Sequence, residues 1–389
     1  MPKSSLRPSP ATLAVLDSLV SFPTVSSESN LALIDWVAAE LEARHAKVER
    51  LPSSCGGKAN LLARLGPDVP GGVVLSGHTD VVPVAGQPWS SDPFELTERN
   101  GRVYGRGTCD MKGFLALCLA LTPAMDQLKK PIYLALSYDE EVGCLGAPGL
   151  IERLASLGAR PSAVIVGEPT ELKVVTAHKG IAYLKTRVRG HEAHSSLQHL
   201  GASAIHAAAR LIGWFSDRQT ANAAVAVAGP DVPEPPFTTL HCGLIQGGTA
   251  PNITAGRCEF TADIRCVAGD DPEQILDAYR AFARTEVEPD LKRVNDAAGI
   301  EVEVLANAPP FRAPPDCSAV ALARRLTGQN DTSAQPYAAE AGQYSAAGFP
   351  TVMCGPGSIE QAHQPDEYIR LEQLAQGEVM LQRLIAELS

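Results

Sequence analysis

The 389-residue sequence has little charge of either sign and lacks a long apolar run. Charged residues make up 20% of it, and the longest apolar stretch, residues 114–125, is too short for a membrane-spanning helix, which needs about 20 residues. The formal net charge of −11 argues against a surface for nucleic acid or for an anionic membrane. We therefore expect a globular protein with no nucleic-acid or membrane partner, whose ligand is a small cationic or zwitterionic molecule.

The nine cysteines contain no C-x-x-C pair, and their number is odd. Both features are typical of reduced thiols in a cytoplasm rather than of a disulfide framework. The first ten residues also lack the apolar core of a secretory signal. These absences together predict a cytoplasmic protein.

Helices alternate with buried strands in the first part of the chain. Apolar spacing predicts helices at residues 10–22, 30–45 and 112–125, and strands at 60–65, 72–75, 132–137 and 163–166. A strand near residues 350–354 and a closing helix at 371–388 continue this pattern at the other end of the chain. The alternation predicts a three-layer α/β domain.

The pattern changes after Pro169. The segments that follow are a strand at 181–188, a helix at 202–215, strands at 238–245 and 258–266, a helix at 271–287 and a strand at 300–305. This is the ferredoxin-like order. We therefore predict an inserted α+β domain at residues 180–306, within an α/β domain formed by residues 1–179 and 307–389.

Three carboxylates, Asp139, Glu140 and Glu141, come directly after the strand predicted at residues 132–137. Open α/β sheets place their sites at the carboxyl ends of strands. Two adjacent glutamates allow one to bind a metal ion while the other moves a proton. An isolated acidic triplet is more often a solvated turn, so this interpretation depends on partners elsewhere in the chain.

Further polar side chains follow other predicted strands or stand in the loops beside them. They are His78, Asp80, Asp110, Glu168 and His363. Each alone also has a structural explanation, such as a capped turn or a helix N-cap. As a set with Glu141, they offer enough imidazoles and carboxylates for two divalent ions about 3.5 to 4 Å apart. Such ligands indicate zinc, with cobalt or manganese as substitutes.

The segments around these residues resemble the M20 family of co-catalytic zinc aminoacylases and peptidases over nearly the whole chain. They are residues 76–80, 106–113, 139–141, 167–169 and 354–368. The last segment and residues 247–252 are similar to the acetylornithine deacetylases of that family in particular. The family fold is an α/β zinc-peptidase-like catalytic domain with an inserted lid and dimerisation domain.

The resemblance implies two Zn²⁺ ions, with His78 and Glu168 on one, Glu141 and His363 on the other, and Asp110 bridging both. Glu140 would be the general base for a zinc-bound hydroxide, and Asp80 would orient His78. A cis peptide bond between Asp110 and Met111 is also implied. The implied reaction is amide hydrolysis, deacetylating N2-acetyl-L-ornithine to L-ornithine and acetate in arginine biosynthesis.

In the inserted domain, the resemblance implies a lid that pairs two subunits into a homodimer. His194 would reach the other subunit's active site and stabilise the oxyanion, as a third catalytic residue. Asn252 and Arg265 match positions that bind the substrate. His199 and Ser203 stand where many relatives have proline and asparagine, so we expect the loop after His194 to differ in shape.

The substrate carboxylate would meet Arg265 or the backbone amides of the loop that contains Gly355, Gly357 and Ser358. Glu340 is our candidate for binding the side-chain ammonium, although it could equally be a carboxylate at the start of a helix. One alternative is a sibling enzyme: a succinyl-diaminopimelate desuccinylase, for which Lys179 would contact the succinyl group, or a broad N-acyl-amino-acid amidohydrolase or dipeptidase. The other is a metal-binding protein without catalytic activity.

Overall fold

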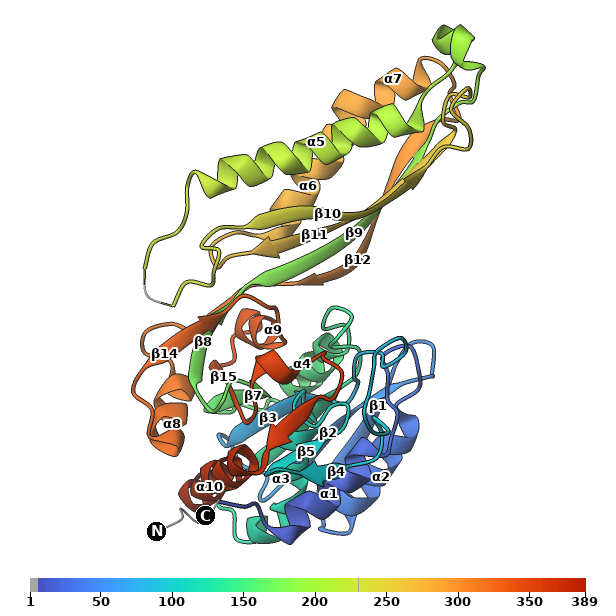
Figure 1. Cartoon of the computed structure of the whole chain (residues 1–389). Helices are drawn as coiled ribbons and strands as arrows, with labels where there is room; N and C mark the ends of the chain where they lie inside the picture. Colours follow the sequence, from blue (N-terminus) through green and yellow to red (C-terminus); the bar gives the residue numbers. More distant parts are fainter. Residues whose placement is uncertain (1–5, 230) are drawn as a thin grey trace. The chain divides into compact units, whose positions relative to one another are not determined.

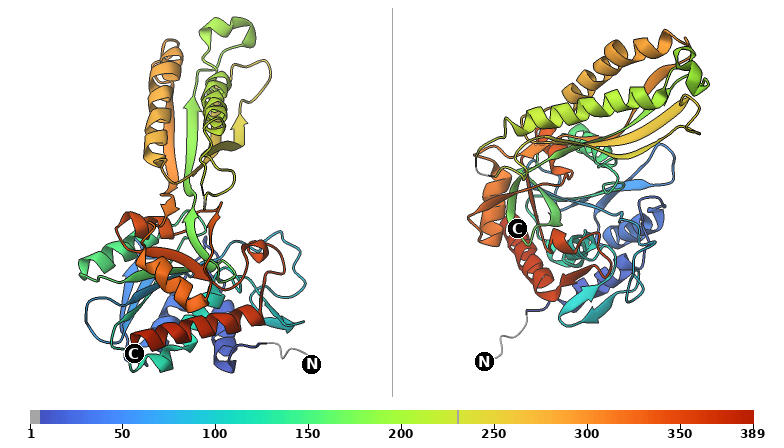
Figure 2. Two further views of the ribbon diagram at one scale, coloured as in Figure 1. Left: turned by 90° about the vertical axis from the view of Figure 1, so that its left-hand side faces the viewer. Right: turned by 45° about the horizontal axis from the view of Figure 1, so that its top comes forward.

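The computed structural model describes residues 6–229 and 231–389, which divide into two compact units. Unit 1 consists of Met1–Thr176, Arg312–Ala334 and Ala339–Ser389. Unit 2 consists of Ala177–Phe311 and Gln335–Ala338, so it interrupts unit 1 in the sequence. Figure 1 follows the chain through both units, and Figure 2 gives two further views.

The main sheet of unit 1 has parallel strands at its centre. Its strands lie in the order β1-β2-β6-β3-β7-β15-β8-β13, and β14 pairs with β8. Their bounds are β1 Lys47–Pro52, β2 Ala59–Leu65, β3 Val73–His78, β6 Ile132–Ser137, β7 Ala163–Pro169, β8 Val174–His178, β13 Phe311–Arg312, β14 Thr332–Gln335 and β15 Thr351–Gly355. Strands β6, β3, β7 and β15 run parallel to one another. Their carboxyl ends therefore meet at one edge of the sheet.

The central strands are buried along their whole length because helices cover both faces of the sheet. Strand β2 shows this by its alternation. Leu61, Ala63 and Leu65 belong to the core that includes helix α2, whereas Asn60, just before Leu61, points to the other side and donates to the carbonyl of Gly146 at the start of α4. The helices of unit 1 are α1 Pro10–Val20, α2 Leu31–Glu42, α3 Lys112–Ala120, α4 Ala147–Ser156, α8 Ser318–Thr327, α9 Ala341–Ala346 and α10 Leu371–Leu388. The three-layer α/β prediction is confirmed.

Smaller elements differ from the expected ones. The helix predicted at 112–125 ends at Ala120 and is followed by the 3-10 helix η1 (Thr122–Met125). Strands β4 (Thr97–Arg99), β5 (Arg102–Tyr104) and β16 (Tyr368–Arg370) form a separate three-stranded sheet. Among the described residues, no helix is both long and apolar enough to span a bilayer.

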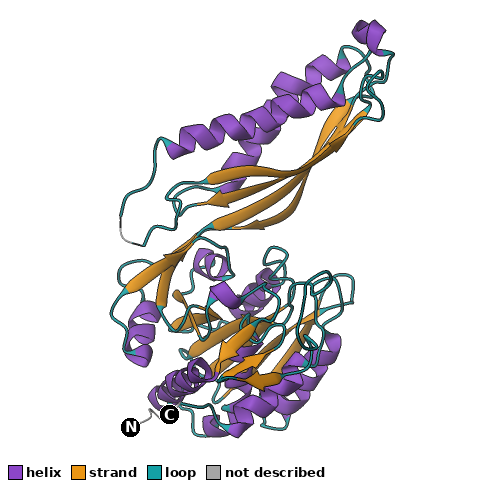
Figure 3. Cartoon of the chain, in the orientation of Figure 1, coloured by secondary structure: helices purple, strands orange, loops and turns teal. Residues whose placement is uncertain are grey.

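Unit 2 is a four-stranded antiparallel sheet with helices along one face (Figure 3). Its elements are β9 Gly180–Arg189, η2 Ser195–Leu200, α5 Ala204–Ala223, β10 Thr239–Gly247, β11 Arg257–Cys266, α6 Pro272–Phe282, the π-helical η3 Ala283–Val287, α7 Glu288–Lys292 and β12 Gly299–Ala308. The sheet order is β10-β11-β9-β12, and Leu211 and Phe215 of α5 pack in one core with Phe260 of β11 and Tyr279 of α6. This is the predicted ferredoxin-like order.

Candidate metal centre

Three neighbouring strands, β6, β3 and β7, bring three of the five predicted ligands to one edge of the main sheet. His78 is the last residue of β3, and Glu168 lies near the end of β7. Glu140 and Glu141 lie in the turn that follows β6. Because these strands are parallel neighbours, their ends lie side by side. The sequence therefore folds so that separate apolar runs all stop at the same place.

Asp110 lies between two imidazoles. Its Oδ1 is 3.0 Å from Nε2 of His78, and its Oδ2 is 3.3 Å from Nε2 of His363. His363 Nε2 is also 2.9 Å from Oε2 of Glu141. One oxygen of Asp110 thus faces each histidine, as a bridging carboxylate requires.

Two overlapping groups of side chains have the compactness of a metal site. Ligand atoms of His78, Asp110 and Glu141 lie within 4.8 Å of one another, as do those of His78, Glu140 and Glu168. Glu140 therefore stands close enough to be either a ligand or a base, and geometry alone leaves that choice open. The ligand and base assignments stay predictions.

The donor set fits a divalent cation. His78 Nδ1 is 2.8 Å from the backbone carbonyl of Asp80, which places its proton on Nδ1 and its lone pair on Nε2, facing Asp110. A lone pair facing a carboxylate oxygen needs a cation or a proton between them. In addition, the buried Oε1 atoms of Glu141 and Glu168 have no hydrogen-bond donor among the described residues.

The electrostatics of the cluster also indicate a shortage of positive charge. Burial raises the pKa of Glu141 to about 7, and it raises the pKa values of Glu140 and Glu168 well above their usual range. Hydrogen bonds to Asp110 and Glu141 raise the pKa of His363 to about 11. Divalent cations would supply the missing charge.

Asp80 contacts its neighbours differently from the expected arrangement. We expected its carboxylate to accept a hydrogen bond from His78, but Oδ1 is 3.7 Å from Nδ1 and the backbone carbonyl accepts instead. The carboxylate accepts from the backbone amides of Glu140 at 3.1 Å and Glu141 at 3.3 Å, and from Ser26 Oγ at 2.7 Å. Asp80 thus joins the histidine of one strand end to the glutamates of the next.

The loop after β15 already uses two of the amides that we expected to bind the substrate. Gly355 N donates to Thr170 Oγ1 at 3.2 Å, and Gly357 N donates to Gln373 Oε1 at 3.2 Å. Gly357 has a φ of +88°, a conformation that favours glycine. The Ser358 carbonyl accepts from Cys109 Sγ at 3.2 Å, which connects the loop to the residue before Asp110.

Glu340 lies in the interior of unit 1, with 1% of its surface exposed. Its Oε2 accepts from Ser76 Oγ at 3.0 Å, and the same hydroxyl bonds to Tyr344 Oη at 3.1 Å. Ser76 is two residues before His78 on β3. Glu340 is therefore hydrogen-bonded to the strand that carries His78.

A family model described as peptidase family M20/M25/M40 matches residues 74–387. The chain belongs to this family. It is also 37% identical over 385 residues to an acetylornithine deacetylase of Myxococcus xanthus, and the match covers 97% of each chain.

Solved structures of M20 proteins have the same fold. An M20 family metallo-carboxypeptidase from Sulfolobus solfataricus matches with a TM-score of 0.74 at 18% identity, covering 96% of this chain and 98% of that one. The YXEP protein of Bacillus subtilis, described as a dinuclear metal binding peptidase from the M20 family, matches with a TM-score of 0.66 at 15% identity, covering 97% of each. The peptide bond between Asp110 and Met111 is cis, as the resemblance to the M20 family implied.

In unit 2 of this M20 chain, two of the predicted lid residues lie together. His194 is exposed and caps η2, and its Nδ1 accepts from the backbone amide of Ser196 at 3.2 Å. The backbone amide of Ser195 donates to the carbonyl of Asn252 at 2.9 Å. Because Nδ1 is an acceptor, the ring proton of neutral His194 is on Nε2, which makes Nε2 a donor.

Arg265 and Lys179 have partners within unit 2. Arg265 Nε donates to Asp263 Oδ1 at 2.9 Å, and its Nη2 donates to Tyr183 Oη at 2.7 Å. The buried Lys179 donates to the carbonyl of Phe237 at 3.1 Å. A substrate carboxylate at Arg265 would therefore compete with Asp263.

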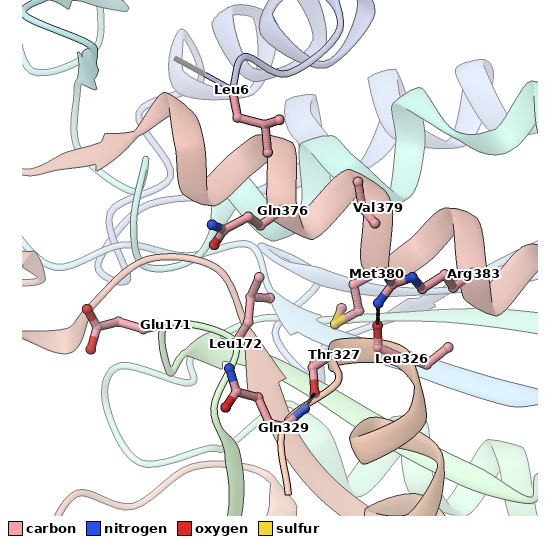
Figure 4. Close-up of a pocket in the computed structure, with 10 residues that line it drawn as sticks. All are labelled: Leu6, Glu171, Leu172, Leu326, Thr327, Gln329, Gln376, Val379, Met380 and Arg383. Atoms are coloured by element: carbon pink, nitrogen blue, oxygen red, sulfur yellow. Dashed lines mark hydrogen bonds between the residues drawn. The ribbon is translucent and has the colours of Figure 1, made fainter. Parts of the chain in front are cut away.

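A surface hollow of about 330 Å³ lies elsewhere on unit 1, and none of the predicted ligands lines it (Figure 4). Leu172, Leu326 and Met380 are among its lining residues, and Arg383 on its wall donates to the Leu326 carbonyl at 2.7 Å. The residues that line this hollow include no group of histidines and carboxylates. We therefore assign the catalytic chemistry to the cluster around Asp110 at the edge of the main sheet.

Sequence reasoning missed two residues that hold the centre together. Arg106 and Glu367 form a buried ion pair of 2.8 Å beside Asp110. Both lie inside segments that resemble the M20 family, and a charged residue between two glycines, as at Arg106, was the available signal.

Proposed function

We propose that this chain is a two-metal amidohydrolase that deacetylates N2-acetyl-L-ornithine. The observation that carries the proposal is the convergence of two imidazoles and four carboxylates on one edge of the main sheet. The 37% identical relative named acetylornithine deacetylase supports the choice of substrate. A place in arginine biosynthesis follows from that substrate.

Two zinc ions are the proposed cofactors, with cobalt or manganese as substitutes. His78 and Glu168 would hold one, Glu141 and His363 the other, and Asp110 would contribute one oxygen to each. When bound, such ions act as Lewis acids that polarise the amide carbonyl and lower the pKa of a water molecule.

Glu140 is the proposed general base. Its backbone amide is fixed by Asp80 at 3.1 Å, and its Oε1 accepts from Cys144 Sγ at 3.3 Å, which leaves Oε2 to accept the proton of the attacking water. The same carboxyl group then gives that proton to the departing nitrogen, so that a neutral amine leaves. No covalent bond to the protein is formed.

His194 is the proposed donor to the oxygen that becomes negative as the amide carbonyl is attacked. Its Nδ1 accepts from Ser196, so its Nε2–H is available for this hydrogen bond. In our proposal, His194 acts at the active site of a second subunit. Leu244 and Ile245 on the edge strand β10 are 71% and 58% exposed, which suits an apolar contact between subunits.

Dimerisation is tested by Ile245→Lys. We expect this variant to run as a monomer by size-exclusion chromatography with light scattering, and to lose most of its activity. The control is Val225→Lys, which changes another exposed apolar residue, 74% exposed, outside the strands. A parent protein that is monomeric at micromolar concentration would refute the dimer.

The substrate is tested by removing metal with a chelator and restoring it with zinc or cobalt. We expect restored turnover of N2-acetylornithine to exceed that of succinyl-diaminopimelate and of N-acetylmethionine. Faster turnover of the succinyl substrate would replace our assignment by the desuccinylase alternative, and comparable rates on all three would favour a broad amidohydrolase or dipeptidase. No metal-dependent hydrolysis of any of them would leave a metal-binding protein without catalytic activity.

The proposal also includes contacts to the substrate. Arg265, Asn252 and the loop of Gly355, Gly357 and Ser358 are candidates for the substrate carboxylate, and Glu340 for the ammonium. Because Glu340 is buried against Ser76, its effect on the ammonium would be exerted through its charge rather than by contact. If Glu340→Gln leaves the preference for acetylornithine over acetylmethionine unchanged, Glu340 has no part in selecting the substrate.

A further inference from the structure

A buried ion pair joins the two loops that carry Asp110 and His363. Arg106 lies in the loop before Asp110, and Glu367 lies four residues after His363. Arg106 Nη1 is 2.8 Å from Glu367 Oε2, and each side chain has 1% of its surface exposed. Burying two charges this completely is unfavourable unless further hydrogen bonds surround them.

The carboxylate of Glu367 supplies such bonds to the loop that ends in Asp110. Its Oε1 accepts from the backbone amides of Cys109 at 2.8 Å and Asp110 at 3.0 Å. Its Oε2 accepts from the amide of Gly107 at 2.9 Å as well as from Arg106. Three amides within four residues thus share one carboxylate, which fixes the backbone immediately before the side chain of Asp110.

The guanidinium of Arg106 makes the corresponding contacts to the His363 loop. Its Nη1 also donates to the carbonyl of Gln364 at 3.3 Å, and its Nη2 donates to Gln87 Oε1 at 2.5 Å. Gln87 in turn donates from Nε2 to the carbonyl of His363 at 3.1 Å. The backbone carbonyls of His363 and Gln364 are therefore both connected to Arg106, the first through Gln87 and the second directly.

We propose that Arg106, Glu367 and Gln87 act together as a positioning clamp that sets the separation of Asp110 and His363. These two residues are the ligands that would share one metal ion with Glu141, so the inference rests on the proposed function. The clamp residues do not touch the metal or the substrate. They act through the backbone of two ligands that come from opposite ends of the chain.

The chemistry of glutamine makes Glu367→Gln a sharp perturbation. The side chain keeps its size, but one of its two oxygens becomes an NH₂ group, which cannot accept a hydrogen bond. Either Gly107 and Arg106, or Cys109 and Asp110, would then face a donor. Loss of groups that orient metal ligands typically weakens metal binding by about 10- to 100-fold.

A buried carboxylate with a purely structural role would give a different result, and Glu378 offers a matched control. Glu378 on α10 is 7% exposed, and its Oε1 accepts from the amide of Ser9 at 2.9 Å and from Ser9 Oγ at 2.6 Å. It also accepts from Thr12 Oγ1. It has the same chemistry and similar burial, but its partners are at the start of α1 and include no proposed ligand.

The test is a titration of the metal-free parent, Glu367→Gln and Glu378→Gln with Zn²⁺ by calorimetry, and with Co²⁺ by visible absorption. We expect the parent to bind two equivalents. Glu367→Gln should bind one of them about 10- to 100-fold more weakly, with an altered cobalt spectrum for that equivalent. Glu378→Gln should bind both as the parent does, even where its thermal midpoint is lower.

Gln87→Leu covers the case in which Glu367→Gln does not fold. Gln87 is only partly buried, and its replacement should weaken binding of the same metal ion by about 2- to 10-fold, which corresponds to the loss of one hydrogen bond. The inference is overturned if Glu367→Gln and Gln87→Leu both bind two ions as the parent does. It is also overturned if Glu378→Gln loses affinity as much as Glu367→Gln does. A parent that does not bind two ions would refute the proposed function itself, which is a separate result.

Discussion

Replacing Glu140 and Glu141 one at a time by glutamine separates the proposed base from the proposed ligand. Both side chains lie within the compact groups of the metal centre, so their positions alone do not distinguish the two roles. Glutamine keeps the size of each side chain, and the backbone amides of both residues remain available to Asp80. The comparison therefore changes the chemistry of one carboxylate at a time.

For Glu140→Gln we expect kcat to fall by about 10² to 10⁴, the usual contribution of a general base. This corresponds to about 3 to 5 kcal/mol in the activation free energy. Both metal ions should stay bound, because five other side chains hold them. For Glu141→Gln we expect one metal ion to be lost on dialysis, because a neutral amide would replace the carboxylate proposed to bind that ion beside His363, whose Nε2 lies 2.9 Å from Glu141 Oε2.

The assay combines metal content after dialysis with kcat at saturating N2-acetylornithine. Glu140→Gln also removes a charge from a cluster in which burial already raises the pKa of Glu140 well above its usual range, so the metal-free variant should unfold at the same temperature as the parent or higher. Loss of a metal ion from Glu140→Gln would make this residue a ligand. Activity above one-tenth of the parent's, with both ions bound, would remove it from the base role.

Other regions allow further tests. In Gly167→Ala the new Cβ would lie 2.1 Å from a ring carbon of Phe114, so we expect the free energy of unfolding to fall by about 1 to 3 kcal/mol and metal affinity to fall with it. Gly213→Ala, in the open interior of α5, should instead stabilise the protein by about 0.5 to 1 kcal/mol. Denaturant unfolding and metal titration of both variants measure these effects, and equal effects would contradict the packing argument. Burial lowers the pKa of His178 to about 4, below its unfolded value of about 6.5. Its contribution of about 3 kcal/mol to the free energy of unfolding should therefore be present above pH 6.5 and be lost as the pH falls towards 4. Urea unfolding at several pH values should show a shallower loss of stability in His178→Gln than in the parent, and parallel curves would refute this role of His178. Chelation should lower the thermal midpoint, and zinc should restore it in a concentration-dependent way; a midpoint independent of zinc would argue against a folded-state metal site.

Three residues of the cluster could be placed from the sequence because each stands at or just after the end of an apolar run. His78, Glu140 and Glu168 stand at or just beyond the ends of strands that are buried on both faces, and such strands are easily recognised in a sequence. The parallel neighbours then bring the ends together without any further information. Local patterns were therefore enough to bring these three residues together, whereas Asp110 and His363 lie in loops, and their assignment as ligands depended on the resemblance to the M20 family.

Elements on the surface of the sheet were harder to predict. Strand β1 carries Lys47, Glu49 and Arg50, and it pairs with the sheet only through β2, so its apolar signal is weak. Strands β4 and β5 are three residues long, which is too short for a periodic pattern. Helix α8 (Ser318–Thr327) is amphipathic, but the proline-rich segment at residues 308–315 shortly before it interrupts the helical pattern.

Contacts that depend on three-dimensional closure could not be predicted at all. Arg106 and Glu367 are 261 positions apart, and each lies in a polar loop where a charge is ordinary. The spacing of His78 and Asp80 allowed either the carboxylate or the backbone carbonyl of Asp80 to accept the imidazole proton. Only the backbone path decides between them.

The wide separation of the ligands along the chain has a consequence for synthesis. Glu141 leaves the ribosome about 220 residues before His363, which at about 5 to 20 residues per second is a delay of roughly 10 to 45 s. During that time the four carboxylates of the cluster exist without one of the two imidazoles and without Glu367, which holds the Asp110 loop. A nascent chain of this protein would therefore carry an incomplete and strongly acidic site until residues 363–367 emerge. In the proposed assignment, the ion bound by His78 and Glu168 could therefore be captured early, whereas the ion of Glu141 and His363 would have to wait for the later segment.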